Sequence, residues 1–243
     1  MITTIAVAGI TGRMGKSIAD IIKSHPQTCL AGGLTRAHIM SQERMKDDDS
    51  FLTHDPEKLF AQCDVIIDFT HANATADIIK AAIEAGKPLL CGTTGLSDEV
   101  KAMMKEAAKS IPFLYASNTS LSLAVTKKLV ALAARLLKDQ DYDVSILDRH
   151  HRWKKDAPSG TALSLGEAVI EGNGGSCEPT YAAIRSGAII GEHEILFGGH
   201  GEYITVRHQV TDRRVFAQGA VDGALWLAQQ PVGFYTMDDV LGA

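Results

Sequence analysis

The residue types best suited to chemistry in this chain are concentrated between residues 148 and 162. This stretch reads Asp-Arg-His-His-Arg-Trp-Lys-Lys-Asp-Ala-Pro-Ser-Gly-Thr-Ala and contains two adjacent histidines, His150 and His151, and two adjacent lysines, Lys154 and Lys155. Histidine changes its charge near neutral pH, and a lysine ammonium can both donate a proton and attract an anion. The stretch is therefore typical of a site that binds a small carboxylate and protonates it.

The sequence on either side predicts a strand before these residues and a helix after them. Residues 144–147, Val-Ser-Ile-Leu, form a short apolar run typical of a strand. Pro158 disfavours helical geometry in the residue before it, so the histidines and lysines are predicted to lie on a loop. Ser159 is a favourable helix N-cap, and the first N–H groups of a helix attract anions. We expect Ser159, Gly160 and Thr161 to hold a carboxylate there; a solvated basic loop is the alternative.

Composition excludes several classes of protein. The chain has 243 residues, 22% of them charged and 45% hydrophobic, and its net charge of -5 argues against a nucleic-acid partner. It contains neither an apolar run long enough to cross a membrane nor a cationic leader at its start. The four cysteines show no CxxC spacing and are expected to be buried free thiols of a cytoplasmic protein: Cys29, Cys63, Cys91 and Cys177.

The N-terminal residues predict a dinucleotide-binding unit. A β-rich apolar run at residues 3–8 is followed by a glycine-rich turn and then by apolar residues at helical spacing. The glycines let the backbone approach a pyrophosphate, which the helix N–H groups can bind. The spacing G-x-x-G-x-x-G is a variant of the commoner G-x-G-x-x-G, and a turn built only for local geometry is the alternative. The residues expected to contact the cofactor here are Gly9, Ile10, Thr11, Gly12, Arg13 and Met14.

In a dinucleotide-binding unit, a residue at the end of the second strand binds the ribose of the adenosine. Residues 29–34 are the candidate strand, and they lead into Thr35 and Arg36 without an Asp or Glu that could bind the ribose diol. Arg36 could instead bind a 2′-phosphate, which favours NADP over NAD. A solvated arginine is an equally good interpretation. The polar residues 37–50 that follow are expected to form a surface loop.

Strands and helices alternate as far as residue 119, which predicts a Rossmann-like, doubly wound parallel sheet. The loop Gly92-Thr93-Thr94 follows one of these strands at the edge where such sheets bind ligands. An apolar helix at residues 121–137 breaks the alternation and is expected to lead into a second unit. The final helix, residues 215–228, is expected to pack back on the first.

Three strand-like runs predict the second unit's sheet. They cover residues 181–185, 188–197 and 203–210 and are separated by glycine turns, which predicts hairpins and a mixed, mainly antiparallel sheet. We expect an α/β dinucleotide-binding domain at residues 1–119, joined by 214–243, and an α+β substrate-binding and oligomerisation domain at residues 120–213.

Residues 150–162 are similar to the signature H-H-x-x-K-x-D-A-P-S-G-T-A of the 4-hydroxy-tetrahydrodipicolinate reductase (dihydrodipicolinate reductase) family. The resemblance covers nearly the whole chain. Further matching segments are Gly9 to Gly15, Asp68 to Thr70, Gly92 to Gly95, Arg185 to Gly187, Gly191 to His193, Arg213, and Phe216 to Ala220.

The resemblance implies an NADPH- or NADH-dependent oxidoreductase of the diaminopimelate route to L-lysine, working as a homotetramer on a small dicarboxylate. It implies His150 as the acid/base residue, Lys154 as the proton donor, and His151, Gly160 and Thr161 as substrate contacts. The implied cofactor contacts are Gly9 to Met14, Gly92, Thr93, Thr94, Ala116, Ser117, Asn118 and Thr119. The chain departs from frequent family residues at Thr35, Thr119 and Ser122.

Two other classes remain open from the sequence. A semialdehyde or aldehyde dehydrogenase of similar architecture would need a nucleophilic cysteine, for which Cys91 is the candidate. A non-catalytic dinucleotide-binding regulatory module would leave the concentration of histidines and lysines unexplained. Since the H-E-x-x-H spacing is absent around His193, that residue is interpreted as structural and no metal is expected.

Overall fold

The computed structural model describes residues 1–36 and 52–242, so the predicted surface loop at 37–50 lies outside the described residues. The chain divides into two compact units, residues 1–120 with 214–243, and residues 121–213. Each unit has its own sheet and its own buried core. None of the helices in the described ranges combines the length and apolar character that a membrane span requires.

The first unit is built on a seven-stranded sheet in the order β11-β6-β5-β4-β1-β2-β3, in which all neighbouring strands are parallel. This confirms the predicted Rossmann-like class. The strands are β1 (Thr3–Ala8), β2 (Thr28–Leu34), β3 (Leu52–Thr53), β4 (Val65–Asp68), β5 (Leu89–Cys91), β6 (Pro112–Tyr115) and β11 (Gly233–Tyr235). The helices are α1 (Arg13–Ser24), α3 (Pro56–Phe60), α4 (Ala72–Ala85), α5 (Asp98–Ala107), α8 (Arg214–Leu227) and α9 (Met237–Val240).

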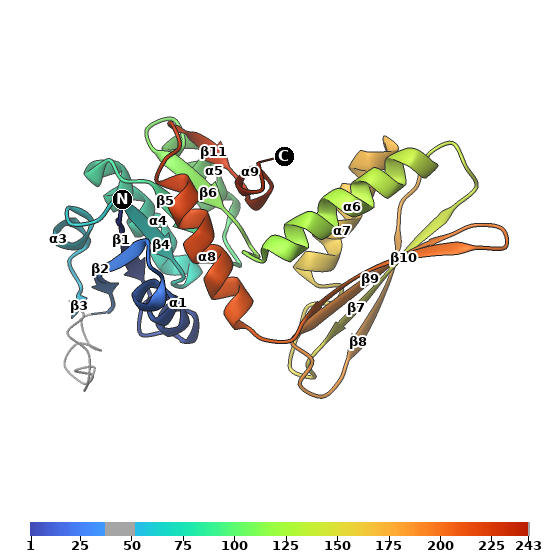
Figure 1. The fold of residues 1–243 in the computed structure, drawn as a ribbon, viewed down its shortest axis with the longest axis horizontal. Coiled ribbons are helices and arrows are strands. Elements are labelled where there is room, and N and C mark those ends of the chain that lie inside the picture. Colours follow the sequence, from blue (N-terminus) through green and yellow to red (C-terminus); the bar gives the residue numbers. More distant parts are fainter. Residues whose placement is uncertain (37–51, 243) are drawn as a thin grey trace. The chain divides into compact units, whose positions relative to one another are not determined.

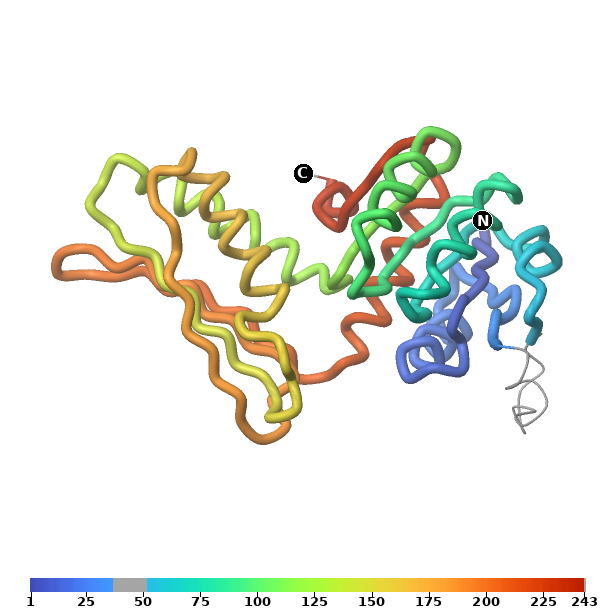
Figure 2. Tube along the Cα trace, turned by 180° about the vertical axis from the view of Figure 1, so that it is seen from behind, coloured from blue at the N-terminus to red at the C-terminus, as the bar shows by residue number. Residues whose placement is uncertain are grey.

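Helices cover the parallel sheet on both faces. Helix α8 packs on α1 and on the central strands, while α3, α4 and α5 pack on one another. Figure 1 shows α8 in front of the sheet, and Figure 2, drawn from behind, shows α4 and α5 in front of it. Strand β4 is buried along its whole length, as expected for a strand covered on both faces. Helix α8, predicted at residues 215–228, lies in the first unit.

The second unit places two helices on one face of a four-stranded sheet (Figure 1). Helices α6 (Leu121–Leu137) and α7 (Gly160–Asn173) lie against each other over strands in the order β10-β9-β7-β8. The strands are β7 (Asp143–His150), β8 (Thr180–Arg185), β9 (Gly191–Gly198) and β10 (Tyr203–Val210). The mixed, mainly antiparallel class is confirmed because β9 is antiparallel to both β7 and β10.

Two sequence predictions need correction. Strand β8 does not form a hairpin with β9; it pairs in parallel with β7, because helix α7 carries the chain back across the sheet. The cysteines are all free, but only Cys63 and Cys91 are buried, whereas Cys29 is exposed and Cys177 is half-buried. Cys29 lies at a position of β2 that the helices do not cover, which the apolar run alone did not indicate.

Candidate active site

Strand β7 carries a buried carboxylate into the core of the second unit. Its side chains alternate between the two faces of the sheet, and Val144, Ile146, Asp148 and His150 all face inward. The aspartate has no exposed surface, so it occupies a position that an apolar residue would ordinarily fill. A buried charge of this kind needs partners, and four neighbouring side chains supply them.

Both oxygens of Asp148 receive donors from other elements. Oδ2 accepts the backbone N–H of Ser159 at 2.8 Å and Nη2 of Arg185, on β8, also at 2.8 Å. Oδ1 accepts the Ser159 hydroxyl at 2.9 Å, lies 2.8 Å from Nδ1 of His150 and lies 3.4 Å from Nε2 of His193, on β9. One carboxylate therefore joins three strands and the start of a helix.

The protonation state of Asp148 follows from these contacts. Burial by itself would raise the pKa of the carboxyl, because the charged form is poorly solvated there. Hydrogen bonds from His150, His193, Arg185 and the Ser159 backbone outweigh burial and hold the pKa of Asp148 well below its ordinary value. The group is an anion at neutral pH.

The loop predicted to carry the catalytic residues begins three residues later than expected, because β7 extends to His150 and not only to residue 147. Only 8% of His150 is exposed. The backbone N–H of Lys154 donates to the carbonyl of His151 at 3.1 Å, which turns the loop back on itself. The ammonium of Lys154 lies 2.9 Å from Asp156, and Arg185 donates to the Asp156 carbonyl at 2.6 Å.

Positive charge surrounds His151. Its own burial lowers its pKa, and the nearby charges of Arg213, His150, Lys154 and Arg185 lower it further. The ring is therefore more readily neutral than an isolated histidine. A region that disfavours one more positive charge is also one that favours a bound anion.

The N-terminus of α7 continues this cationic region. Ser159 is its N-cap, as predicted, and the hydroxyl accepts the Ala162 N–H at 3.1 Å. The backbone N–H and hydroxyl of Ser159 both donate to Asp148, and the residue is 1% exposed. Gly160 is exposed, and a Cβ atom at that position would meet nothing within 4 Å. The start of the helix is thus accessible at Gly160, while Ser159 fixes its position.

Sequence reasoning missed Asp148, Arg185 and His193 as members of this site. The sequence indicates a structural role for His193, yet its ring packs edge-on against His150 with the ring centroids 5.2 Å apart. The one available signal was the alternation along 144–150, which places Asp148 among inward-facing residues. Contacts with Arg185 and His193 depend on strand order and could not be found in this way.

The atoms of Asp148, His150 and His193 that could hold a metal ion lie within 4.8 Å of one another. A cation there would have to compete with Arg185 and with two donors of Ser159 for the same carboxylate. The guanidinium would also repel it, being 2.8 Å from the same carboxylate. These neighbours fit a hydrogen-bonded cluster better than a metal centre.

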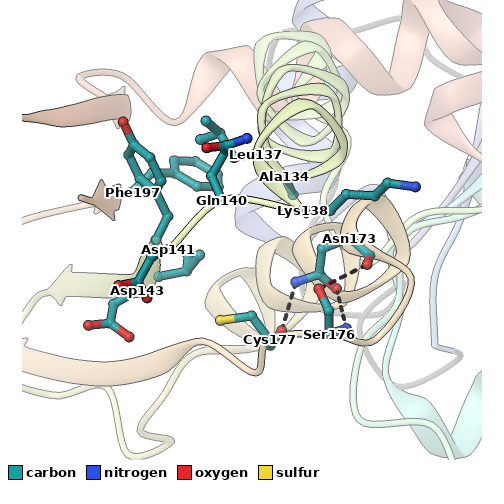
Figure 3. A pocket seen from close by; sticks show the side chains of 12 residues that line it. Ala134, Leu137, Lys138, Gln140, Asp141, Asp143, Asn173, Ser176, Cys177 and Phe197 are labelled. Atoms are coloured by element: carbon teal, nitrogen blue, oxygen red, sulfur yellow. Dashed lines mark hydrogen bonds between the residues drawn. The ribbon is translucent and has the colours of Figure 1, made fainter. Parts of the chain in front are cut away.

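A cavity of about 270 Å³ in the same unit lies at the other end of β7 (Figure 3). Val144 lines it, six residues before His150, so roughly 20 Å of strand separate the two places. Its buried amide, Asn173, is bonded to the Cys177 carbonyl at 2.8 Å and to the Gly175 and Ser176 N–H groups. Those bonds close the turn after α7 and satisfy the Asn173 amide.

The first unit holds a second cavity, of about 380 Å³, at the carboxyl edge of its sheet. Gly9 adopts φ 83°, and a Cβ atom there would lie 2.5 Å from the carbonyl oxygen of Phe69. Gly15 packs equally closely, since its Cβ would lie 2.2 Å from the oxygen of Gly9. Only glycine is accommodated at these two positions, as expected for a turn that approaches a phosphate group closely. The cavity is lined by Gly9, Thr11, Gly12, Leu34, Thr35, Arg36, His54, Phe69, Thr70, His71, Ala74 and Ile78.

The predicted cofactor residues of the first unit differ in exposure and in contacts. Ile10 is buried, and its side chain packs against Gly33. The Thr119 hydroxyl donates to the Phe216 carbonyl at 2.6 Å, inside the first unit. Arg13 is exposed and Met14 half-buried at the start of α1. The sequence did not single out His54 or His71, which also line the cavity.

The remaining predicted cofactor residues follow β5 and β6, beside β4 at the same sheet edge. Gly92 lies under the ring of Phe69, and the Thr93 hydroxyl accepts the Thr70 N–H at 3.1 Å. Thr94 and Ser117 are exposed, Ala116 is buried, and Asn118 accepts the Ser120 N–H at 3.0 Å. These loops lie where parallel sheets bind ligands.

Cys91 cannot serve as the thiolate that an aldehyde dehydrogenase would need. It has no exposed surface, and its thiol donates to Oδ2 of Asp68 at 3.6 Å. Burial, and then the neighbouring Asp68, raise the pKa of the thiol far above its ordinary value. A nucleophilic cysteine needs the opposite, an exposed position and a lowered pKa.

Known proteins resemble this chain over nearly its whole length. Residues 3–119 match a family model described as dihydrodipicolinate reductase, N-terminus, and residues 122–241 match dihydrodipicolinate reductase, C-terminus. Proteins named 4-hydroxy-tetrahydrodipicolinate reductase are similar over nearly their whole length. The one from Zymomonas mobilis is 40% identical over 98% of this chain and 96% of its own. The one from Chromohalobacter salexigens is 36% identical over 99% of this chain and 98% of its own.

Solved structures share the fold at lower identity. A dipicolinate-bound dihydrodipicolinate reductase from Paenisporosarcina sp. TG-14 is 22% identical, with a TM-score of 0.81 over 97% of this chain and 98% of its own. A probable dehydrogenase from Thermotoga maritima is 13% identical, with a TM-score of 0.67 over 98% of this chain and 92% of its own. Fold and sites together define a nicotinamide-dependent oxidoreductase. Within that class, the chain belongs to the dihydrodipicolinate reductase family.

Proposed function

We propose that this protein reduces 4-hydroxy-tetrahydrodipicolinate to tetrahydrodipicolinate with NADPH or NADH, in the diaminopimelate route to L-lysine. The observation that carries the proposal is the arrangement around Asp148, which places His150 beside the cationic loop and the exposed start of α7. A dinucleotide-binding regulatory module without catalytic activity would not require a buried carboxylate in contact with a histidine. Family membership supplies the substrate.

The first unit is proposed to bind the cofactor, at Gly9 to Met14 and at the loops after β5 and β6. When bound, the reduced nicotinamide supplies a hydride to carbon. The adenosine end would lie at Thr35 and Arg36, where the two hydroxyls of Thr11 and Thr35 share a hydrogen bond of 3.1 Å. The part of the cavity lining that the structure describes contains Arg36 and neither Asp nor Glu, so we expect a 2′-phosphate to bind there at least as well as a ribose diol.

The second unit is proposed to bind the dicarboxylate and deliver the proton. One carboxylate would lie at the N–H groups of Gly160 and Thr161, where the helix dipole favours an anion. The other would pair with Lys154, with His151 beside it. Since the Asp156 side chain is 55% exposed, a substrate carboxylate can take its place next to the ammonium.

The reduction also needs a proton at the atom beside the carbon that receives the hydride. Lys154 carries one on its ammonium, and His150 can exchange one through its ring. Arg185 and Ser159 act indirectly in this scheme, since their hydrogen bonds to Asp148 keep β7, the loop and α7 in register.

We also propose a homotetramer, located in the cytoplasm, whose subunit contacts lie on the second unit. Helices cover only one face of its sheet. The other face carries the half-buried Leu147 and Leu196 and the exposed Ile184, which is 43% exposed. An antiparallel sheet with an apolar open face is commonly covered by a partner. Sedimentation at micromolar concentration should give a tetramer; a monomer would refute this part.

The test of the function is a three-part assay that follows the absorbance of the reduced cofactor. Oxidation is expected on adding freshly generated 4-hydroxy-tetrahydrodipicolinate. No oxidation is expected with an aldehyde or without a substrate. A protein that binds NADPH but is inactive with all three additions would be a regulatory module, and oxidation driven by the aldehyde alone would identify a different dehydrogenase.

A further inference from the structure

The orientation of the Asp148 carboxylate is fixed by two donors that cannot reverse their roles. The Ser159 backbone N–H and the Arg185 guanidinium both donate to Oδ2, and neither can accept a hydrogen bond in return. The carboxylate therefore presents its other oxygen, Oδ1, in a set direction. That oxygen lies 2.8 Å from Nδ1 of His150.

This distance decides which nitrogen of His150 carries a hydrogen. Nδ1 of His150 is not aligned for a hydrogen bond with any described residue, but it lies 2.8 Å from Oδ1. A bare lone pair that close to an ionised carboxylate oxygen would be repelled, so the tautomer with hydrogen on Nδ1 is favoured. In the neutral ring the hydrogen is then on Nδ1, and Nε2 has a lone pair. Nε2 is left as the nitrogen that takes up and releases a proton.

Gly191 lies next to the Nε2 side of the His150 ring. A Cβ atom at Gly191 would lie 3.2 Å from Nε2 of His150, closer than ordinary van der Waals contact. Gly191 has no positive φ that would otherwise explain the residue type. Lack of a side chain at this position leaves the Nε2 edge uncrowded.

His193 supports the ring from the next strand. Its Nε2 lies 3.4 Å from Oδ1 of Asp148 and 3.3 Å from the Ser159 hydroxyl, and its ring packs edge-on against His150. His208 stacks on His193 at 6.2 Å and contacts the Ser122 hydroxyl at 3.2 Å. These neighbours limit rotation of His150 about its side-chain bonds.

We propose that Asp148 is the positioning residue of His150: it fixes the tautomer with hydrogen on Nδ1 and directs Nε2 to the proton exchange of the reaction. Its effect on turnover rests on the proposed function, but the tautomer itself does not. An Asp–His pair of this kind makes the histidine useful because a ring with the wrong tautomer cannot act at the substrate.

Asp148→Asn tests the assignment sharply. The asparagine oxygen would occupy the Oδ2 position, because Ser159 and Arg185 require an acceptor there. Its NH₂ group would then face Nδ1 of His150, which must become the acceptor. The substitution is nearly equal in size to aspartate, yet it should invert the tautomer and place the hydrogen on Nε2.

The first measurement uses the unaltered protein labelled with ¹⁵N-histidine, and long-range ¹H–¹⁵N correlation reads the tautomer. The His150 signal is identified by its loss in His150→Gln. Hydrogen on Nδ1 is expected, and hydrogen on Nε2 would overturn the proposal whatever the enzymatic activity proves to be. This measurement requires no variant with a disturbed core beyond the one used for assignment.

The second measurement compares kcat and KM in Asp148→Asn. We expect kcat to fall at least about 100-fold, as for loss of general acid–base catalysis, with a smaller change in the KM for the dicarboxylate. Asp148→Glu restores a carboxylate and should recover part of the turnover. Equal loss in the Asn and Glu variants would show a packing effect alone and overturn the positioning role.

Glu192→Gln is the matched control. Glu192 is also a buried acid of this sheet, held by Arg149 and by Arg207 at 2.7 Å, but it lies on the face away from His150. Its substitution should leave kcat within about twofold and the His150 tautomer unchanged. A loss of turnover as large as that of Asp148→Asn would mean that any broken ion pair in the sheet has this effect, and the proposal would fail.

Discussion

The ammonium of Lys154 lies 2.9 Å from the carboxylate of Asp156, two residues further along the same loop. The pKa of Asp156 lies below its ordinary value, because hydrogen bonds and the charge of Lys154 outweigh its partial burial. Ion pairs this exposed contribute little to stability. The pair matters more as a way to hold the Lys154 ammonium in place until a substrate carboxylate arrives.

Lys154→Ala should therefore lower kcat and raise KM together, because the same ammonium binds a carboxylate and donates the proton. A fall in kcat of about 10²–10⁴-fold is expected from loss of general acid catalysis. Steady-state kinetics with separate measurement of cofactor binding provide the check, and cofactor affinity should not change. Lys155→Ala is the control, since Lys155 is an exposed neighbour. Equal effects of the two substitutions would contradict the role of Lys154.

Pyridine-2,6-dicarboxylate, a flat mimic of the substrate, should compete with it and raise the melting temperature. Each carboxylate has its own partners, one at the N-terminus of α7 and one at Lys154, and charge-assisted hydrogen bonds are the stronger kind. Pyridine-2-carboxylate lacks one of these anions and should bind at least about tenfold more weakly. Thermal shift and inhibition constants measure the difference, and equal affinities would refute a two-carboxylate site.

Arg36→Ala should weaken NADPH more than NADH. A charge-assisted bond to the 2′-phosphate contributes roughly 1.5–3 kcal/mol, so the affinity ratio of the two cofactors should change by more than about tenfold. Fluorescence titration of both cofactors against the same variant measures it, with NADH as the internal control. An unchanged ratio would show that Arg36 is only a solvated side chain.

Gly191→Ala should impair turnover, because the new methyl group would lie 3.2 Å from Nε2 of His150. Gly198→Ala is a matched control on the same strand, since a Cβ atom there would meet nothing within 4 Å. We expect kcat to drop about tenfold or more in the first variant and to remain unchanged in the second. If both variants keep the kcat of the original protein, the Nε2 edge of His150 beside Gly191 does not take part in the reaction.

Ser159→Ala should reduce the free energy of unfolding by roughly 2 kcal/mol, at the upper end for an N-cap, because the hydroxyl is buried and also donates to Asp148. Ser97→Ala is the comparison. Ser97 also caps a helix, but its bond to the Val100 N–H is exposed and longer, at 3.4 Å, so roughly 0.5–1 kcal/mol is expected. Urea denaturation followed by circular dichroism measures both. A smaller loss in Ser159→Ala than in Ser97→Ala would contradict the reading of Ser159 as a structural anchor.

Local sequence determined much of this protein. The run at residues 3–8 with its glycine turn predicted β1 and α1, and residues 121–137 predicted α6 with its observed bounds. Ser159 was identified as an N-cap because that role needs only a hydroxyl within three residues of the N–H it accepts. Strand, helix and N-cap patterns depend only on residues close together in the sequence, so they can be recognised without the tertiary structure.

The tertiary structure alone decided how distant residues meet. Asp148 contacts Arg185, 37 residues away, because β8 lies parallel to β7. It contacts His193 because β9 pairs with β7 on the other side, with Asp148 opposite His193. An alternating pattern shows which face of a strand is buried, but it contains nothing about which strand lies alongside or in what register. Strand partners are chosen by packing of the whole core, so the residue that holds His150 could be recognised only once the sheet was assembled.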